Sequence, residues 1–297
     1  MPAFLSKLSI VIVNYNLGED TVSCINSLIK AGAKEEQIIV VDNQSTDNSV
    51  SYIRERFGHI NIIVMPDNRG YPHALNTGVN ESLNKNFDWI LLLNNDIVVD
   101  KDFLMALEKA VLENREISLF SPAIYYYDEP DTIWYLSEKV IVGTLIGVRY
   151  LRNRKISKKL PLIIPTDFLN GCAMLVHRKV FENIGLFNDD EFIYGDDPDF
   201  SWRAKRNGFK AASVPDAKMW HKVSKTMKKT KPNTRYLKIR NTIRFYKKHA
   251  KGFVYPIMIL FTFARILVLS LLDLLQKRSD LVKAMWKGWL DGWLSSR

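Results

Sequence analysis

Short apolar runs that end in polar residues recur four times in the first hundred residues. The runs begin at Lys7, Gln37, Asn61 and Trp89, and each is rich in Val, Ile or Leu before it changes to Asn, Asp or Gly. Continuous runs of this kind are typical of strands that are buried on both faces of a parallel sheet. We therefore predict four such strands, with their polar ends at the carboxyl edge of the sheet.

Helical periodicity separates the first three runs. Residues 19–31 place Val22, Ile25 and Leu28 on one face at helical spacing, and residues 48–57 follow a Ser-Thr-Asp segment suited to capping a helix. The alternation of strand and helix predicts right-handed βαβ units, which bind ligands at the carboxyl ends of the strands. The expected fold class is α/β, with a Rossmann-like, mostly parallel sheet flanked by helices.

Three polar residues, Asn94, Asn95 and Asp96, end the fourth apolar run. A carboxylate at the carboxyl end of a strand is well placed to hold a divalent metal against a phosphate. An ordinary Asx turn is the alternative, because Asn and Asp favour turns for their own reasons. This run alone does not decide between the two.

A second group of acids lies in the segment GDDPDFSWR. Asp196, Asp197 and Asp199 stand at the expected start of a helix, and Pro198 suits its first turn. The exposed amides of a first turn favour acids, so capping alone would explain one or two of them. Three acids beside an aromatic residue and an Arg indicate a carboxylate that is held in place for proton transfer.

Length and composition fit one large α/β domain with a basic appendage. The chain has 297 residues and is 47% hydrophobic, and its net charge is +10. Residues 218–297 carry 19 Lys and Arg against 3 Asp, whereas residues 1–217 carry 23 basic and 29 acidic residues. The basic charge therefore belongs to the tail. The two cysteines, Cys24 and Cys172, lie among apolar residues and are expected to be core thiols.

The tail also has the composition of a membrane-surface segment. Residues 252–275 are mostly apolar but contain Arg265 and Asp273, and residues 282–293 place three Trp on one helical face. A central Arg disfavours spanning by about 2.5–3.5 kcal/mol. We expect peripheral or monotopic attachment to an anionic membrane surface. A spanning helix, or helices that pack on the protein core, are the alternatives.

Seven motifs occur in the order found in the family 2 inverting glycosyltransferases of the GT-A fold, and they most resemble its rhamnosyltransferase-like branch. They are VNYN, VDNQSTDNS, DNRGYPHALNTG, LLLNNDIVVD, FLNGCAML, GDDPDFSWR and His221. Residues 234–248 also resemble the usual carboxyl-terminal extension of that branch. The resemblance implies a GT-A glycosyltransferase domain over residues 1–222 and a basic, apolar, helical membrane-associating extension over residues 223–297.

The resemblance further implies roles for individual residues. Asp96 and His221 would ligate Mg²⁺ or Mn²⁺, and Asp197 would be the general base. The sequence departs from the family pattern where Asn94 replaces the first Asp of the DXD motif, and where Asp196 replaces a commoner Glu. The resemblance implies contacts of Asn14, Asn16 and Asp42 with the base and ribose. It implies contacts of Asn68, Gly70 and Asn76 with the nucleotide and donor sugar. The other implied substrate-binding residues are Asn94, Asn95, Asp196, Trp202 and Arg203.

These features predict an inverting enzyme that moves one sugar from a nucleotide-diphosphate sugar to a hydroxyl of a glycan or lipid-linked glycan. The expected donor is dTDP-rhamnose or a UDP-hexose, and the expected setting is cell-envelope polysaccharide synthesis at the cytoplasmic face of the membrane. A sugar nucleotidyltransferase is one alternative, but the loop NYNLGED is acidic and has one Gly. A non-catalytic module that binds membrane or nucleic acid is another, and it would leave the polar strand ends unexplained. We expect no nucleic-acid partner, and the sequence leaves the sugar, the acceptor and the oligomeric state open.

Overall fold

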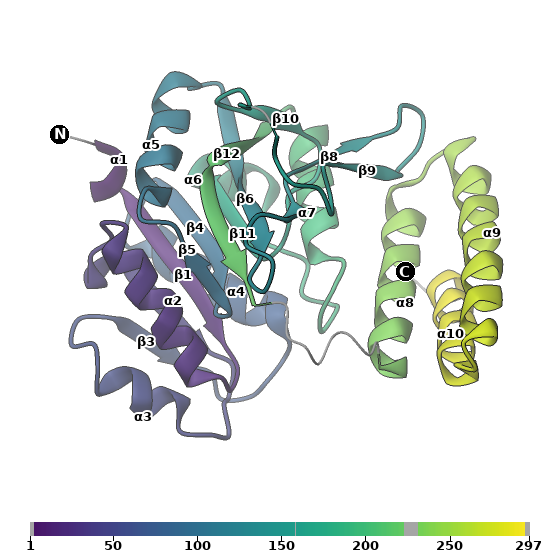
Figure 1. Ribbon diagram of the computed structural model, residues 1–297, viewed down its shortest axis with the longest axis horizontal. Helices are drawn as coiled ribbons and strands as arrows, with labels where there is room; N and C mark the ends of the chain where they lie inside the picture. The colour runs from purple at the N-terminus through teal and green to yellow at the C-terminus, as the bar shows by residue number, and fades with distance from the viewer. Residues whose placement is uncertain (1–2, 158, 223–230, 295–297) are drawn as a thin grey trace. The chain divides into compact units, whose positions relative to one another are not determined.

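The computed structural model describes residues 3–157, 159–222 and 231–294, and these form two compact units (Figure 1). The first unit comprises the described residues up to 139, residues 149–192 and residues 196–222. The second unit comprises residues 140–148, residues 193–195 and the described residues from 231 onward. Two short segments from the first 222 residues therefore group with the helical extension.

Among the described residues, the first unit is built around one mixed, ten-stranded sheet (Figure 1). Its strands are β1 (Leu8–Asn14), β2 (Ile38–Asp42), β3 (Asn61–Val64), β4 (Trp89–Asn94), β5 (Ile97–Val99), β6 (Ile117–Tyr126), β7 (Ile133–Tyr135), β10 (Ile164–Thr166), β11 (Ala173–His177) and β12 (Lys210–His221). The order along the sheet is β10-β12-β6-β11-β4-β1-β2-β3, with β5 on β12 and β7 on β6. A separate two-stranded sheet pairs β8 (Ser137–Val140) with β9 (Gly147–Tyr150).

The four predicted strands and their common polar edge are confirmed. β4, β1, β2 and β3 run parallel, so that Asn14 lies opposite Asp42 and Val13 lies opposite Asn94. The rest of the sheet adds antiparallel pairs, because β11 runs opposite to both β4 and β6. The prediction of burial on both faces is wrong for β3, where Val64 is 49% exposed. β3 is the edge strand, and among the described residues it pairs only with β2.

Helices cover both faces of this sheet, because alternate strand residues point to opposite sides. Ile10 and Ile12 of β1 pack with residues of α2 (Gly18–Lys30), α3 (Ser49–Arg54) and α5 (Phe103–Glu113). Val11 and Val13 pack with residues of α4 (Tyr71–Asn84), α6 (Arg178–Ile184) and α7 (Asp196–Arg206). Two apolar layers thus hold the sheet and leave its polar carboxyl edge for chemistry. The shorter helices are α1 (Ala3–Ser6) and the 3₁₀ turn η1 (Glu35–Gln37).

The second unit contains three long helices, α8 (Pro232–His249), α9 (Val254–Leu275) and α10 (Ser279–Leu294). α10 lies close against α8 at Gly288 and Gly292. A Cβ added to Gly288 would fall 2.7 Å from the carbonyl oxygen of Tyr236, and one added to Gly292 would fall 2.6 Å from the Cβ of Ile243. Only residues without a side chain fit at this spacing, so the two glycines define the α8–α10 contact.

α9 packs on α10 through the tryptophans that the sequence placed in a membrane interface. Trp286 Nε1 donates to Ser270 Oγ at 3.1 Å, and Trp289 Nε1 donates to Thr262 Oγ1 at 3.1 Å. The ring of Trp293 contacts Tyr255 at a centroid distance of 5.3 Å. These indoles lie against another helix of the same unit and remain partly exposed, so the predicted place of the Trp face in a membrane interface stays a prediction.

The other face of α9 is apolar and exposed. α9 is the helix that, among the described residues, is long and apolar enough to cross a membrane by length and composition. Its one deeply buried acid, Asp273, lies against Arg235 at 3.3 Å and is also paired with Arg278 inside the unit. The exposed apolar face consists of Ile257, Leu260, Leu267, Val268, Leu271, Leu272, Leu274 and Leu275.

Candidate active site

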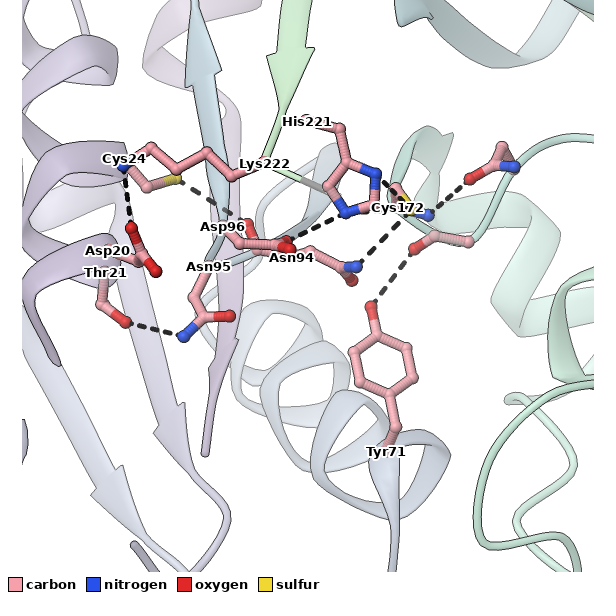
Figure 2. Close-up of polar contacts among 12 residues, drawn as sticks. Asp20, Thr21, Cys24, Tyr71, Asn94, Asn95, Asp96, Cys172, His221 and Lys222 are labelled. Carbon is pink, nitrogen blue, oxygen red and sulfur yellow. Dashed lines mark hydrogen bonds and ion pairs between the residues drawn. The ribbon is translucent and has the colours of Figure 1, made fainter. Parts of the chain in front are cut away.

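Asp96 and His221 lie together at the carboxyl edge of the sheet (Figure 2). Asp96 follows β4, and His221 ends β12, where it pairs with Ile97 of β5. His221 Nε2 lies 3.1 Å from Asp96 Oδ1. A carboxylate and an imidazole are both ligands that Mn²⁺ accepts. The fold thus joins two residues that are 125 positions apart in the sequence and that the resemblance names as metal ligands.

His221 is held in a nearly closed environment. It is 8% exposed, its Nδ1 lies 3.8 Å from Cys172 Sγ, and its ring contacts Trp134 at 4.8 Å. Burial alone lowers the pKa of His221, but Cys172 and Asp96 outweigh burial and raise it above the ordinary value. In the described part of the chain, no three His, Cys, Asp or Glu side chains gather as metal ligands. A metal on Asp96 and His221 would therefore need further ligands from substrate or water.

Asn94 and Asn95 point away from each other (Figure 2). Asn94 Nδ2 donates to Cys172 Sγ at 3.5 Å. Asn95 Nδ2 donates to Asn14 Oδ1 at 3.2 Å and to Thr21 Oγ1 at 3.1 Å. Asn95 therefore ties the end of β4 to the end of β1, while Asn94 remains beside the Cys172–His221 contact.

Asn14 and Asp42 form a buried frame at the ends of β1 and β2. Asn14 Nδ2 donates to Asp42 Oδ1 at 2.6 Å and to Ser45 Oγ at 3.0 Å, and its Oδ1 accepts from Thr21 and Asn95. Asp42 also accepts from the backbone and hydroxyl of Ser45. All four hydrogen-bonding positions of Asn14 are used inside the protein. These bonds support the ends of β1 and β2, and direct contact of Asn14 and Asp42 with the base stays a prediction.

Asn43 is a candidate site residue that the sequence reasoning missed. It is 4% exposed, and its Nδ2 donates to Asn68 Oδ1 at 2.9 Å and to the Gly70 carbonyl at 3.3 Å. Its Oδ1 is buried and has no partner among the described residues. Buried carbonyl oxygens are normally hydrogen-bonded, so this atom requires an explanation. The available signal was its place directly after Asp42 at the end of a buried strand.

Asn16 and Asn68 lie in the loops next to Asn43. Asn16 is partly exposed, adopts a left-handed backbone with φ of 53°, and accepts the Thr46 amide at 2.9 Å through Oδ1. Asn68 Oδ1 accepts the Gly70 amide at 3.1 Å in addition to Asn43. Both residues therefore shape the loops after β1 and β3, and Asn16 keeps a partly exposed side chain.

Gly70 and Asn76 fasten the start of α4 to the chain that precedes α7. Gly70 has φ of 101°, and an added Cβ would fall 2.3 Å from the carbonyl oxygen of Phe192. Asn76 is buried and exchanges two hydrogen bonds with the backbone of Phe187, at 2.9 and 3.0 Å. Both ends of the Asn76 amide are bonded to the backbone, and the expected contact of Asn76 with donor sugar stays a prediction.

The acidic pair Asp196 and Asp197 opens α7, at the start of the helix that the sequence predicts. Asp197 Oδ2 accepts the Gly171 amide at 3.1 Å. Burial raises the pKa of Asp197 to about 6, although the Gly171 amide and the Arg149 guanidinium favour the charged form. Burial and the charge of Asp197 raise the pKa of Asp196 to about 7. Such a carboxyl group is suited to accept a proton near neutral pH.

Two charged residues near this pair carried no sequence motif. Arg149 Nε donates to Glu138 Oε2 at 2.8 Å, across the pair of strands β8 and β9. Their opposite charges act on the pKa of Asp197 in opposite directions. Because neither residue belongs to a sequence motif, only the tertiary structure could associate them with the acids.

Tyr71 and Lys222 are two further residues that sequence reasoning did not find (Figure 2). The Tyr71 hydroxyl donates to the Gly171 carbonyl at 3.2 Å. The Lys222 amide donates to the Asp96 carbonyl at 2.8 Å, and its Nζ binds Asp20 at 2.8 Å. A hydroxyl and a cation therefore lie on either side of the Asp96–His221 pair.

Arg203 and Trp202 belong to the interior packing of α7. Arg203 Nε donates to Asp199 Oδ2 at 2.7 Å, and its two terminal nitrogens donate to the carbonyls of Ile184 and Leu186 at 2.7 Å each. Trp202 contacts the ring of Phe168 at 6.0 Å, and its Nε1 is buried without a partner among the described residues. These contacts give Arg203 a structural role, and its expected part in substrate binding stays a prediction.

Replacing Arg203 with Gln is expected to lower the free energy of unfolding by about 3 kcal/mol, because it removes the guanidinium that contacts the buried Asp199 carboxylate at 2.7 Å. Nucleotide affinity measured at a temperature where the variant remains folded should change by less than about twofold. Chemical denaturation of Arg203→Gln beside Arg206→Gln, an exposed Arg of the same helix, measures the effect. A variant that keeps its stability but loses nucleotide binding would restore the substrate-binding role.

Comparison with known proteins places this chain in a family. The model of glycosyl transferase family 2 matches residues 9–185, which is more than half of the chain. The chain belongs to glycosyl transferase family 2. It is therefore a glycosyltransferase, and the predicted family is confirmed.

Two relatives and one solved structure illustrate the match. The low-salt glycan biosynthesis hexosyltransferase Agl10 of Haloferax volcanii is 31% identical over 205 residues. These residues cover 68% of this chain and 62% of that protein, so the chain spans less than two thirds of the length of Agl10. The N-acetylglucosaminyl-diphospho-decaprenol L-rhamnosyltransferase of Mycobacterium tuberculosis is 24% identical over 72% of this chain and 75% of its own length. The mannosyltransferase PcManGT from Pyrobaculum calidifontis, solved with GDP-Man and Mn²⁺, superposes with a TM-score of 0.58 at 14% identity, covering 98% of this chain and 88% of that chain. The fold is GT-A, as the resemblance implied.

Proposed function

We propose that this family 2 glycosyltransferase moves one sugar from a nucleotide-diphosphate sugar to a hydroxyl of a glycan or lipid-linked glycan, with inversion at the anomeric carbon. One observation carries the proposal. Gly171 donates its amide to Asp197, and the next residue, Cys172, contacts His221, the partner of Asp96. The proposed base and the proposed metal ligands therefore adjoin a single dipeptide.

Asp197 would act as the general base. The acceptor oxygen forms a bond to the anomeric carbon while the bond from that carbon to the diphosphate oxygen breaks, and the hydroxyl proton moves to Asp197. Attack from the face opposite the leaving group inverts the centre in a single displacement. No covalent intermediate with the enzyme forms, so no nucleophile is assigned. The raised pKa of Asp197 supports this role, because a stronger base takes the proton more readily.

Asp96 and His221 would hold Mg²⁺ or Mn²⁺. The contact between a carboxylate and an imidazole supports a divalent cation, and so does the Mn²⁺ bound in the PcManGT structure. The cation would neutralise the charge that builds on the leaving diphosphate. Lys222, which is fixed to the Asp96 carbonyl, would add positive charge beside the same group.

The nucleoside would bind at the ends of β1 and β2. The buried, unpartnered Oδ1 of Asn43 supports a contact with a ligand N–H, such as the imide of a pyrimidine. Asn16, in the adjoining loop, would contact the ribose. Asn14 and Asp42, which are hydrogen-bonded to each other at the ends of β1 and β2, would support the loops that carry Asn16 and Asn43.

A donor screen tests the proposed reaction. Purified enzyme with Mn²⁺ is supplied with dTDP-rhamnose, UDP-hexoses and GDP-mannose, and the release of nucleotide diphosphate is measured with and without a lipid-linked acceptor. The names of the rhamnosyl and hexosyl relatives support dTDP-rhamnose and UDP-hexoses as the first donors. Acceptor-dependent release from one donor is expected. Release of pyrophosphate from a nucleoside triphosphate and a sugar phosphate would instead indicate a nucleotidyltransferase.

We also propose that the second unit attaches the enzyme to the cytoplasmic face of a membrane as a peripheral or monotopic anchor. The exposed apolar face of α9 supports this role, as does the excess of Lys and Arg in the tail. One face of α9 is committed to α10, and Asp273 is paired inside the unit. These contacts favour insertion of one helix face over a spanning helix. Residues 223–297 would thus serve attachment, and residues 1–222 would serve transfer.

Replacing Leu260 and Leu271 together with Glu is expected to reduce binding to anionic vesicles by at least about tenfold, because two charges would enter the apolar face. Both side chains are exposed, so the fold should tolerate the change. Sedimentation with phosphatidylglycerol vesicles measures the effect. The matched control is Met105→Glu with Leu112→Glu, which are exposed apolar positions on α5. Unchanged sedimentation of the α9 variant would remove α9 as the attachment face.

A further inference from the structure

The segment that leads into the catalytic acids is held by a helix of the carboxyl-terminal extension. Residues 193–195 group with the second unit, although the residues on either side group with the first. Within the second unit, Asn241 Nδ2 of α8 donates to the carbonyl of Ile193 at 2.7 Å and to the carbonyl of Tyr194 at 2.9 Å. The Asn241 side chain is 2% exposed. One buried amide thus binds two consecutive carbonyls just before the acids.

The backbone of this segment needs outside support. Tyr194 and Gly195 have φ of 68° and 97°, so two consecutive residues adopt left-handed conformations. A bulky non-glycine residue in that region is disfavoured and persists when its surroundings hold it there. α8 provides those surroundings. Lys238 Nζ lies 4.9 Å from the centre of the Tyr194 ring, and a Cβ added to Gly195 would lie 3.3 Å from the Cβ of Asn241.

The preceding residue is fixed as well. The Phe192 carbonyl accepts the Tyr71 amide at 2.9 Å, and Gly70 approaches it closely. Beyond Tyr194, only Gly195 and Asp196 intervene before Asp197. Consecutive Cα atoms are about 3.8 Å apart, so a displacement of the Tyr194 carbonyl passes along a very short chain to the base. A misplacement of about 1 Å in a reacting group costs about a hundredfold in rate.

We propose that Asn241 is a positioning residue for the general base. By holding the carbonyls of Ile193 and Tyr194, it sets where α7 begins and where the Asp197 carboxylate points. The inference rests on the proposed role of Asp197 as the base. It means that the extension takes part in turnover as well as in attachment.

The test uses Asn241→Asp in the full-length protein with a short soluble acceptor. This change removes both N–H donors in a side chain of the same shape, and the contact of Arg240 Nε with Oδ1 at 2.9 Å is retained. The matched control is Asn233→Asp, an exposed Asn of the same helix. We expect kcat to fall by about tenfold or more, while the donor KM and the affinity for nucleotide diphosphate stay within about twofold. Amide hydrogen exchange should rise in residues 190–200 of the variant and stay unchanged in the control.

Either of two kinetic results would overturn the proposal. The first is an unchanged kcat in folded Asn241→Asp, and the second is a loss of nucleotide affinity as large as the loss of kcat, which would indicate general disruption. If Asn241→Asp does not fold, Asn241→Ala is assayed in the same way and judged by the same criteria. Hydrogen exchange needs no substrate. A wild type that transfers no sugar would contradict the proposed function. Unchanged hydrogen exchange in residues 190–200 of the variant would contradict the positioning role of Asn241, whatever the outcome of the activity assay.

Discussion

Replacing Asp197 with Asn is expected to lower kcat by about two to four orders of magnitude. The amide of Asn cannot take the proton of the acceptor hydroxyl, whereas its oxygen can still accept the Gly171 N–H, which lies 3.1 Å from Asp197 Oδ2. Donor binding should therefore stay within about twofold. Steady-state release of nucleotide diphosphate measures kcat, and calorimetry with the nucleotide diphosphate measures affinity.

The pH profile of the wild type provides a second readout of the same residue. A general base works only in its deprotonated form, and burial raises the pKa of Asp197 to about 6. Activity should therefore be full above this pH and should fall about tenfold per pH unit below it. An ordinary, exposed carboxyl group would keep its activity down to about pH 4. Residual activity of Asp197→Asn should lose this acid limb.

The exposed Asp190 supplies the control, because Asp190→Asn removes a charge from the same segment without touching the site. It should retain the rate and pH profile of the wild type. Near-normal turnover by Asp197→Asn would sink its assignment as the base. A loss of donor affinity as large as the loss of rate would make Asp197 a binding residue instead.

Replacing Asp96 with Ala is expected to abolish metal-dependent binding of nucleotide diphosphate, because it removes the carboxylate that faces His221 at 3.1 Å. Replacing His221 with Ala should raise the Mn²⁺ concentration needed for half-maximal activity by at least about tenfold. Mutation of a residue that only supports a metal ligand already lowers metal affinity by about tenfold or more. Titration of Mn²⁺ in binding and activity assays measures both effects.

His59→Ala is the control for the histidine, because His59 is exposed and lies in the loop before β3. It should leave the Mn²⁺ requirement unchanged. Full wild-type activity in excess EDTA would refute a metal-dependent reaction altogether. An Mn²⁺ requirement that stays the same in His221→Ala would remove the histidine and leave Asp96 as the protein ligand.

The local pattern of apolar runs that end in polar residues predicted which edge of the sheet carries the candidate site. Continuous apolar runs of four to seven residues have few stable solutions other than buried strands, and polar residues must then follow at the strand ends. Parallel pairing brought Asn14 opposite Asp42 and set Asn94 beside them, as the alternation of strands and helices predicts. The order of seven motifs pointed to the family, which the family match then confirmed.

The partner of each polar side chain was decided by the tertiary structure. Asn14, Asn76 and Arg203 read as ligand-binding residues in the sequence, yet each uses its donors and acceptors inside the protein. An Asn at the end of a strand gives the same sequence pattern whether its side chain binds a substrate or a neighbouring loop. Only the tertiary structure shows which lone pairs are already taken, and it reveals that the Asn43 Oδ1 has no partner among the described residues.

The sequence by itself determined the strands, their polar edge and the acids that gather there, because burial leaves a local periodicity that can be read residue by residue. The tertiary structure decided the contacts between distant segments, such as Cys172 with His221, 49 residues apart, and Asn241 with Ile193, 48 residues apart. It also turned the Trp face of α10 toward α9, because an apolar helix face has the same pattern whether it meets lipid or another helix. Such pairings depend on how packed elements meet, and that information is spread over the whole chain.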